Sequence, residues 1–272
     1  MTKAVHNKMN TVKPQVNPEI FRETVRERIH SETPAEVKIR TVSRAAVADV
    51  EAAGGQGCAV GISADVTDRD RAQAAIDKTI DAFGEFDILI NDAAMGPQFF
   101  TDNFAAHQPK FWDIDPELWH RVLTVNAYGP QLMSSVAAPH LVERGWGRII
   151  NTASAHSKVA SPFKSAYNSA KHGLDGLTKT VALELAEFGV TANCISPGYV
   201  WTPLVENQIP DTMAARGLTR EQVINDVLLV KQATKKFVQP DEIGALAVFL
   251  CRDEAQNVNG ANWSVDGGWT AL

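Results

Sequence analysis

Cysteine is scarce in this chain, with 3 among 272 residues, at Cys58, Cys194 and Cys251. They form no CxxC pair and no cluster with histidine at metal-ligand spacing, so we expect no disulfide framework, no bound metal and a reducing, cytoplasmic setting. Basic residues are outnumbered by acidic ones, 26 to 32. The net charge of -6 and the lack of a dense basic run argue against a nucleic acid partner.

Long apolar runs are missing as well. No run approaches the roughly 20 residues of a membrane span, and residues 1–30 contain no apolar core suited to a signal peptide. We therefore expect no membrane partner. With 44% hydrophobic residues the chain is nevertheless rich enough in apolar side chains to build one large core.

Glycine is absent before Gly54. This absence excludes from the first fifty residues a glycine-rich turn, the element with which many α/β folds bring backbone amides close to a phosphate group. Residues 1–35 are instead polar, with prolines at 14, 18 and 34 and a single predicted helix, from Pro18 to His30. We expect residues 1–35 to be an atypical N-terminal segment.

Apolar runs bounded by turn residues follow from residue 36 onward. Continuous short runs are typical of buried parallel strands, and longer amphipathic stretches between them are typical of helices. The strands are expected at 36–40, 58–63, 86–90, 147–151, 190–195 and 261–265. The helices are expected at 41–53, 69–83, 116–132, 178–188 and 242–250, with two more in a lid at 203–240.

Ser154, Tyr167 and Lys171 lie in one stretch, Ile150 to Gly173. Tyr167 and Lys171 are four residues apart, so on a helix their side chains share one face. A neighbouring ammonium favours the phenolate, which would let Tyr167 act as a general acid or base. Ser154 follows a predicted strand and could hydrogen-bond a substrate oxygen. An isolated Tyr and Lys pair is more often a pair of solvated surface residues. The spacing to Ser154 therefore has to distinguish a catalytic pair from a surface pair.

That spacing, a Ser followed by Tyr thirteen residues later and Lys four further, resembles the catalytic signature of the short-chain dehydrogenase/reductase family. The resemblance implies an α/β fold with a doubly wound, Rossmann-like parallel sheet, here a single domain over 36–272 whose first βαβ unit is missing or degenerate. It also implies that Asn126 completes a catalytic tetrad by helping to hold the lysine. Family members assemble, so a homo-oligomer, either dimer or tetramer, is expected.

The resemblance also implies sites for NAD, or alternatively NADP. Three further pieces match it: A-D-V-T-D at residues 64–68, N-D-A-A at 91–94 and P-G-Y-V-W-T at 197–202. Asp92 departs from the family's asparagine, which puts a hydrogen bond between strands in doubt. The cofactor-binding residues implied are Asp65, Val66, Asn91, Ala93, Tyr167, Lys171, Pro197, Gly198, Val200 and Thr202.

Within the family, pieces around residues 153–156, 164–167, 203–208 and 265–271 resemble members that act on 3-hydroxybutyrate. They imply a small-molecule hydroxy acid substrate bound by His156, Lys164, Gln208 and Trp269. A cation and fixed donors are what a small carboxylate needs in place of water. The aromatic-rich stretch 95–115 is either a surface loop or a wall of this site.

Two alternatives remain open. One is a 3-oxoacyl or general ketone reductase of the same family. The other is a non-catalytic relative that has lost cofactor binding, which the missing glycine-rich turn favours and the complete Asn126, Ser154, Tyr167 and Lys171 set opposes.

Overall fold

The computed structural model describes residues 39–100 and 105–271. Its centre is a parallel sheet in which four strands lie in sequence order, β1-β2-β3-β4. The strands are β1 (Ile88–Asn91), β2 (Gly147–Thr152), β3 (Val190–Pro197) and β4 (Asn262–Val265). The register pairs Ile90 with Ile150, and Ile150 with Asn193. Nearly every residue of β2 and β3 is buried, as expected for strands covered on both faces.

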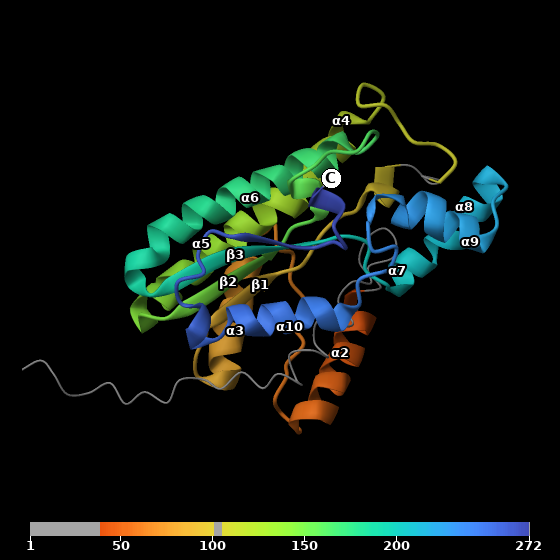
Figure 1. Cartoon of the computed structure of the whole chain (residues 1–272). Helices are drawn as coiled ribbons and strands as arrows, with labels where there is room; N and C mark the ends of the chain where they lie inside the picture. Colours follow the sequence, from red (N-terminus) through yellow and green to blue (C-terminus); the bar gives the residue numbers. More distant parts are fainter. Residues whose placement is uncertain (1–38, 101–104, 272) are drawn as a thin grey trace, which may run out of the picture.

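Helices cover both faces of the sheet, as Figure 1 shows for α6 (Ser165–Leu185) and α10 (Pro240–Leu250), which lie on opposite sides. The α6 side also holds α3 (Arg69–Phe83) and α5 (Gly129–Arg144), whose apolar residues share one core cluster with Ile149 and Ala192. On the other side α10 packs against Ile150 and Ile195. The parallel sheet with helices on its two faces confirms the predicted fold class.

The remaining elements connect these layers. The helices are α2 (Ile39–Gly54), α4 (Pro116–Leu123), α7 (Pro203–Glu206), α8 (Gln208–Arg216) and α9 (Arg220–Gln222). The π-helical turns are η2 (Thr124–Tyr128) and η5 (Val223–Leu228). The 3-10 turns are η1 (Pro97–Phe100), η3 (Ala155–Ser157), η4 (Ala186–Phe188), η6 (Leu229–Lys231), η7 (Asp253–Ala255) and η8 (Trp269–Ala271).

Several predicted elements form with boundaries close to those expected, because local signals fix them. The Asp68 side chain accepts hydrogen bonds from the amides of Asp70 and Arg71 at the start of α3, and Gly84 ends that helix with a φ of 83°. Gly189, with a φ of 74°, likewise ends the long helical stretch of α6 and η4.

One predicted strand is wrong, and another is wrong at the end that the structure describes. Residues 39 and 40 begin α2 rather than continuing a strand, and residues 36–38 lie outside the described residues, as does the predicted helix at 18–30. Residues 58–63 form no strand, and in the described part of the chain none of their backbone groups bonds to the sheet. A strand needs a partner, so the apolar pattern alone was not enough.

Two of the predicted helical regions are interrupted in the structure. The single helix expected at 116–132 is α4, the π-helical turn η2 and α5 in succession. The two helices expected at 203–240 are the shorter pieces α7, α8 and α9, followed by η5 and η6. The π-helical turns widen the backbone locally, which redirects the side chains that they carry.

Candidate active site

The carboxyl ends of the four strands bring the candidate residues to one edge of the sheet. Asp92 follows β1, Ser154 follows β2, Gly198 follows β3 and Asp266 follows β4. Because parallel strands all end on the same side, these segments meet where open α/β sheets bind ligands.

Ser154 lies at the turn between β2 and η3 and is 8% exposed. Its hydroxyl accepts a hydrogen bond from the His156 amide at 3.2 Å, and its carbonyl accepts one from the Ser157 hydroxyl at 2.7 Å. These bonds fix the backbone on both sides of the serine. The Ser154 side chain also lies near the Tyr167 hydroxyl, from the first turn of α6, and lowers the pKa of that phenol. The predicted serine and tyrosine pair therefore meets.

Lys171 lies one turn after Tyr167 on α6 and is 2% exposed. Its ammonium donates to the Thr152 carbonyl at 2.6 Å and lies 5.8 Å from the centre of the Tyr167 ring. Burial lowers the pKa of Lys171 to about 8, although the nearby negative charge of Asp92 raises it. The predicted shared face of Tyr167 and Lys171 is confirmed.

The pKa of Tyr167 differs from the sequence-based expectation. Burial raises the pKa of Tyr167, and this effect outweighs the lowering by the Ser154 hydrogen bond, while the charge of Asp92 raises it further. We expected Lys171 to lower it. The ammonium donates to the Thr152 carbonyl and lies over the Tyr167 ring. The neighbouring side chains thus do not lower the pKa of Tyr167 toward neutral pH.

Asn126 is fully buried in the π-helical turn η2. Its side-chain oxygen accepts the Met95 amide at 2.7 Å, and its side-chain nitrogen donates to the Met95 carbonyl at 2.8 Å. In the described residues Asn126 thus clamps the segment after β1, and its amide is occupied there rather than directed to Lys171.

The segments expected around the adenine and the strand ends are also ordered by hydrogen bonds. Asp65 accepts from the Thr67 hydroxyl at 2.7 Å and from its amide at 2.9 Å, and these bonds lower the pKa of Asp65. A Cβ on Gly129 would lie 3.0 Å from Val66, which shows how closely that side chain packs against the start of α5. Ala93 is exposed.

A side-chain hydrogen bond between strands is made by Asn91 rather than by Asp92. Asn91 donates to the Asn151 side-chain oxygen at 2.8 Å and so joins β1 to β2. Asp92 instead places a negative charge close enough to Tyr167 and Lys171 to act on both.

The turn after β3 is held closely against its surroundings. Gly198 lies against Asp266, where a Cβ would come 3.0 Å from the Asp266 Cα, and the Val200 side chain is buried in the α10 core cluster. Pro197 ends β3 in register with Val265. Thr202 is 2% exposed, and its hydroxyl accepts the Val205 amide as the cap of α7, which leaves its hydrogen as a donor.

A nicotinamide nucleotide fits the described residues at its nicotinamide ribose. An ammonium has three donors, and one on Lys171 bonds to Thr152, so the others suit the ribose hydroxyls at the base of the site. For the pyrophosphate the fit is poorer, because the first fifty residues contain no glycine with which backbone amides could approach it.

The expected substrate residues form a cluster next to Tyr167. His156 lies edge-on to Tyr167 at 5.8 Å and to Trp269 at 5.1 Å between ring centres. Its Nε2 is 3.0 Å from the Ser161 hydroxyl. Burial, together with the charge of Lys164, lowers the pKa of His156 to about 3, so the ring is neutral. Burial also lowers the pKa of Lys164 to about 8.

Gln208 does not join this cluster. It begins α8, and its side-chain nitrogen donates to the Leu204 carbonyl at 3.0 Å within the segment 203–240.

Tyr199 is a member that the sequence analysis missed. Its ring stacks on Trp269 with a 5.9 Å separation and a 12° angle. The P-G-Y-V-W-T motif contained this residue, but the motif was considered only for the cofactor. We call His156, Tyr199 and Trp269 the aromatic wall.

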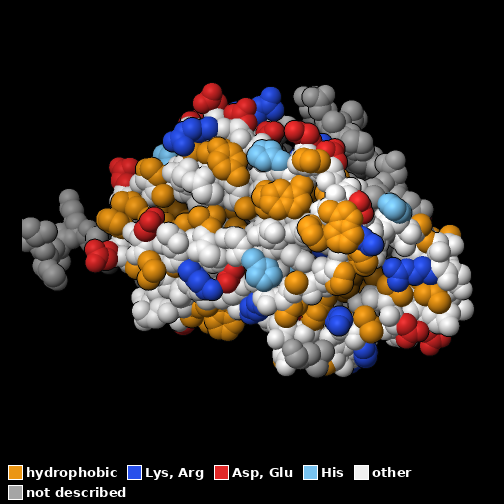
Figure 2. All heavy atoms as spheres, turned by 90° about the horizontal axis from the view of Figure 1, so that it is seen from above, with side chains coloured by type: hydrophobic (Ala, Val, Ile, Leu, Met, Phe, Trp, Pro, Cys, Tyr) orange, Lys and Arg blue, Asp and Glu red, His pale blue; other side chains and the backbone are white. Residues whose placement is uncertain are grey.

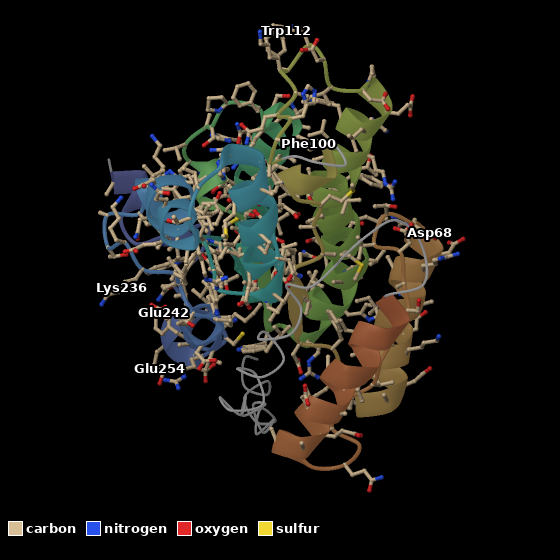
Figure 3. The ribbon with its side chains drawn as sticks, turned by 90° about the vertical axis from the view of Figure 1, so that its right-hand side faces the viewer. Asp68, Phe100, Trp112, Lys236, Glu242 and Glu254 are labelled. Carbon is tan, nitrogen blue, oxygen red and sulfur yellow. The ribbon has the colours of Figure 1, made fainter. Side chains whose placement is uncertain are left out.

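The aromatic stretch 95–115 divides between the two alternatives. Phe100 is buried in a cluster that includes Tyr167 and Trp119, whereas Phe111 and Trp112 are 68% and 64% exposed. Figure 3 shows Trp112 at the far end of the loop, with Phe100 directed into the body of the protein. The first part of the stretch, with Phe100, thus packs beside the site, and the tip, with Phe111 and Trp112, lies on the surface. Phe104 lies outside the described residues.

Other classes of site are absent from the part of the chain that the structure describes. Within residues 39–100 and 105–271, no group of His, Cys, Asp or Glu could hold a metal ion, and the helices include none long and apolar enough to cross a membrane.

Comparison with known proteins gives consistent matches. The family described as Enoyl-(Acyl carrier protein) reductase matches residues 30–270. The chain is 53% identical over 191 residues to the D-beta-hydroxybutyrate dehydrogenase of Rhizobium meliloti (strain 1021), covering 70% of each. It is 44% identical over 189 residues to the D-beta-hydroxybutyrate dehydrogenase of Cupriavidus necator, covering 70% of this chain and 69% of that one.

A solved structure agrees. Sorbitol-6-phosphate 2-dehydrogenase SrlD from Erwinia amylovora matches with a TM-score of 0.74 at 26% identity, over 84% of this chain and 86% of that one. With the Ser154, Tyr167 and Lys171 geometry at the carboxyl edge of a parallel sheet, these matches show that the chain belongs to the short-chain dehydrogenase/reductase family.

Proposed function

We propose that this protein is an oxidoreductase that moves a hydride between a nicotinamide cofactor and a small hydroxy acid, with 3-hydroxybutyrate and acetoacetate as the substrate pair. The observation that carries the proposal is the position of Tyr167. Its hydroxyl lies next to Ser154, and its ring lies edge-on to His156 of the aromatic wall, so a proton-transfer group and the proposed substrate residues meet. The two D-beta-hydroxybutyrate dehydrogenase relatives support the same substrate.

In oxidation, Tyr167 as the phenolate would take the proton of the substrate hydroxyl. Ser154 would donate a hydrogen bond to the same oxygen and hold it toward Tyr167. A bound nicotinamide supplies the hydride acceptor. Lys171 would bind the ribose with the donors that Thr152 does not use. Asn126 supports this site indirectly, by fixing the Met95 segment.

At the other end of the substrate, Lys164 would supply the charge that a carboxylate requires. Its ammonium is charged below a pH of about 8, because burial lowers the pKa of Lys164 to about 8. Neutral His156 has one donor and one acceptor nitrogen. Its Nε2 lies 3.0 Å from the Ser161 hydroxyl and its Nδ1 3.4 Å from the Ser154 hydroxyl, so one of these contacts would give way to the substrate. Trp269 closes the apolar side.

Gln208 would have to leave the Leu204 carbonyl to reach a ligand, which a movement of the segment 203–240 would allow. We propose that this segment is a lid.

The proposed cofactor is NAD, with NADP as the alternative. Titration calorimetry with each nucleotide, followed by absorbance assays with 3-hydroxybutyrate, tests the proposal. Saturable binding of NAD and reduction that depends on 3-hydroxybutyrate are expected. If neither nucleotide binds, the non-catalytic alternative stands, which the lack of an early glycine-rich turn favours. If turnover occurs only with 3-oxoacyl or simple ketone substrates, the broader reductase is correct.

We also propose a homo-oligomer. Leu183 on α6 is 79% exposed, and Phe188 on η4 just beyond it is 46% exposed. Figure 2 looks onto the α6 side of the molecule and shows hydrophobic side chains among scattered charges there. Light scattering after size exclusion should give a mass of two or four chains, and the exposed-residue variant Leu183→Glu should lower it. A monomeric mass for the unaltered protein would contradict the proposal.

A further inference from the structure

Gln232 lies at the end of the proposed lid, between η6 and α10, and is fully buried. An amide in this position must satisfy its polar atoms inside the protein, because leaving them unpaired costs free energy. Its side-chain oxygen accepts a hydrogen bond from the Tyr199 amide. Its side-chain nitrogen donates to the Lys236 carbonyl at 2.6 Å. One side chain therefore joins the lid to the turn that carries Tyr199.

The Lys236 side chain itself points outward, as Figure 3 shows, so Lys236 contributes only its backbone carbonyl to this link. Near this link, the Thr234 amide of the lid donates a hydrogen bond to the Gly267 carbonyl at 3.0 Å. The same lid end thus contacts both the turn after β3 and the turn after β4.

Two glycines leave room for the Gln232 side chain. A Cβ on Gly198 would lie 2.5 Å from the Gln232 side-chain oxygen, and a Cβ on Gly267 would lie 3.3 Å from its side-chain nitrogen. Gly267 also has a φ of 60°, which other residues rarely adopt. The two turns are thus shaped around this amide from both sides.

These turns carry two members of the aromatic wall. Tyr199 follows Gly198 directly, and Trp269 comes two residues after Gly267. The rings of Tyr199 and Trp269 stack on each other, and Trp269 contacts His156. A displacement of either turn would therefore move the wall, whereas Ser154, Tyr167 and Lys171 are held by other elements, η3 and α6.

We propose that Gln232 is a positioning residue that sets the aromatic wall and ties its geometry to the lid. The inference rests on the proposed function in one respect, that the wall receives the substrate. Because the proton-transfer residues lie on separate elements, loss of the two Gln232 hydrogen bonds affects substrate binding more than the chemical step.

The test compares two variants that each remove one buried amide of similar shape. Gln232→Met removes the bonds to Tyr199 and Lys236. Asn193→Leu is the matched control, because buried Asn193 also donates to one backbone carbonyl, of Val258 at 2.7 Å, and accepts one backbone amide, of Ala261 at 3.0 Å. Both should lower the melting temperature. We expect Gln232→Met to raise KM for the hydroxy acid about tenfold, the effect of roughly one lost buried hydrogen bond, with kcat within about threefold.

Asn193→Leu should leave both constants near those of the unaltered protein. Equal KM values for the two variants, or a loss confined to kcat in Gln232→Met, would overturn the proposal.

Gln232→Glu provides a rescue that depends on pH. A protonated carboxyl can accept from Tyr199 and donate to Lys236, whereas the ionised form can only accept. Burial should raise the glutamate pKa above its usual value of about 4.3. The KM ratio of Gln232→Glu to the unaltered protein should therefore be near 1 at low pH and increase with pH. Taking the ratio removes the titration of Lys164. A ratio that does not change with pH contradicts the proposal.

Hydrogen exchange separates this inference from the proposed function. In Gln232→Met, amides in residues 198–201 and 266–270 should exchange faster than in Asn193→Leu, whether or not the protein turns over. If the unaltered protein is inactive but this difference appears, the proposed function fails and the positioning role stands. Without the difference the positioning role fails.

Discussion

Asn126 and Met95 exchange two hydrogen bonds, with the Met95 amide donating at 2.7 Å and the Met95 carbonyl accepting at 2.8 Å. The bonds connect a π-helical turn to a segment 31 residues earlier in the chain. They satisfy an amide side chain that is fully buried, and they hold the start of the aromatic stretch next to Tyr167.

Asn126→Ala should lower the free energy of unfolding by roughly 2–4 kcal/mol, because it leaves two backbone groups of Met95 without partners. Urea unfolding monitored by circular dichroism measures this change. Gln73→Ala is the control, since it removes only an exposed hydrogen bond to Asp77 and should change stability by less than about 0.5 kcal/mol. Equal losses in the two variants would show that the clamp is unimportant.

Tyr167→Phe should lower kcat at least about 100-fold, the smaller end of what a general acid or base contributes. The ring remains, so its packing against His156 and the fold should persist. Steady-state assays and nucleotide titration provide the two readouts. Tyr128→Phe, at a 48% exposed position on η2, serves as the matched control and should be fully active. Retained activity in Tyr167→Phe would refute the proposed role.

Asp92→Asn should move the pH profile of oxidation to lower pH. The negative charge of Asp92 raises the pKa of both Tyr167 and Lys171. Without this charge the phenolate, which is the base, forms at a lower pH. The acidic limb of the kcat profile therefore moves to lower pH. The ammonium of Lys171 is then also lost at a lower pH, so the alkaline limb moves in the same direction. Profiles of kcat against pH test this.

Asp70→Asn, which neutralises an exposed carboxylate at the start of α3, should leave the profile in place. An upward shift in Asp92→Asn would mean that Asp92 acts through structure rather than charge.

Lys164→Met should raise KM for a hydroxy acid about 10- to 100-fold, the value of a hydrogen bond to a charged group. In the unaltered protein KM should increase as pH rises through about 8, because burial lowers the pKa of Lys164 to about 8 and the ammonium is lost there. The variant should lose this pH dependence. Lys78→Met, on the exposed side of α3, should show neither effect. An unchanged KM would exclude Lys164 from the substrate site.

The same substitution should make the protein more stable at neutral pH. Since the pKa of Lys164 is lower in the folded protein than its usual 10.5, the unfolded chain binds more protons between pH 8 and 10.5. Stability from this group therefore increases with pH across that window, and below it the buried charge is a cost. Melting temperatures at neutral pH should be higher for Lys164→Met. A lower value would indicate that the ammonium has a stabilising partner.

The sequence predicted the sheet best where strands are buried on both faces. The runs at 86–90 and 190–195 became β1 (Ile88–Asn91) and β3 (Val190–Pro197), since the strands of a covered parallel sheet are largely buried and rich in apolar residues. Residues 58–63 have the same pattern but form no strand, because pairing depends on a neighbour that the local pattern does not contain.

The site was predictable in its residue types and less so in its electrostatics. Spacing on α6 was enough to place Tyr167 and Lys171 on one face. The pKa of Tyr167 depends on how deeply the fold buries it and on Asp92, which comes from another strand end. Likewise, the contacts of Gln232 with Tyr199 and Lys236 arise only when the lid reaches the sheet edge.

The sequential order of the strands has a consequence for synthesis on the ribosome. Each new strand can join the edge left by the strand before it, so β1, β2 and β3 can pair before β4 is made. Ser154, Tyr167 and Lys171 all precede β3, whereas Trp269 follows β4. We expect a nascent chain to assemble its proton-transfer residues first and to remain open on the substrate side until the turn after β4 has left the exit tunnel. Protease sensitivity of stalled chains would reveal that order.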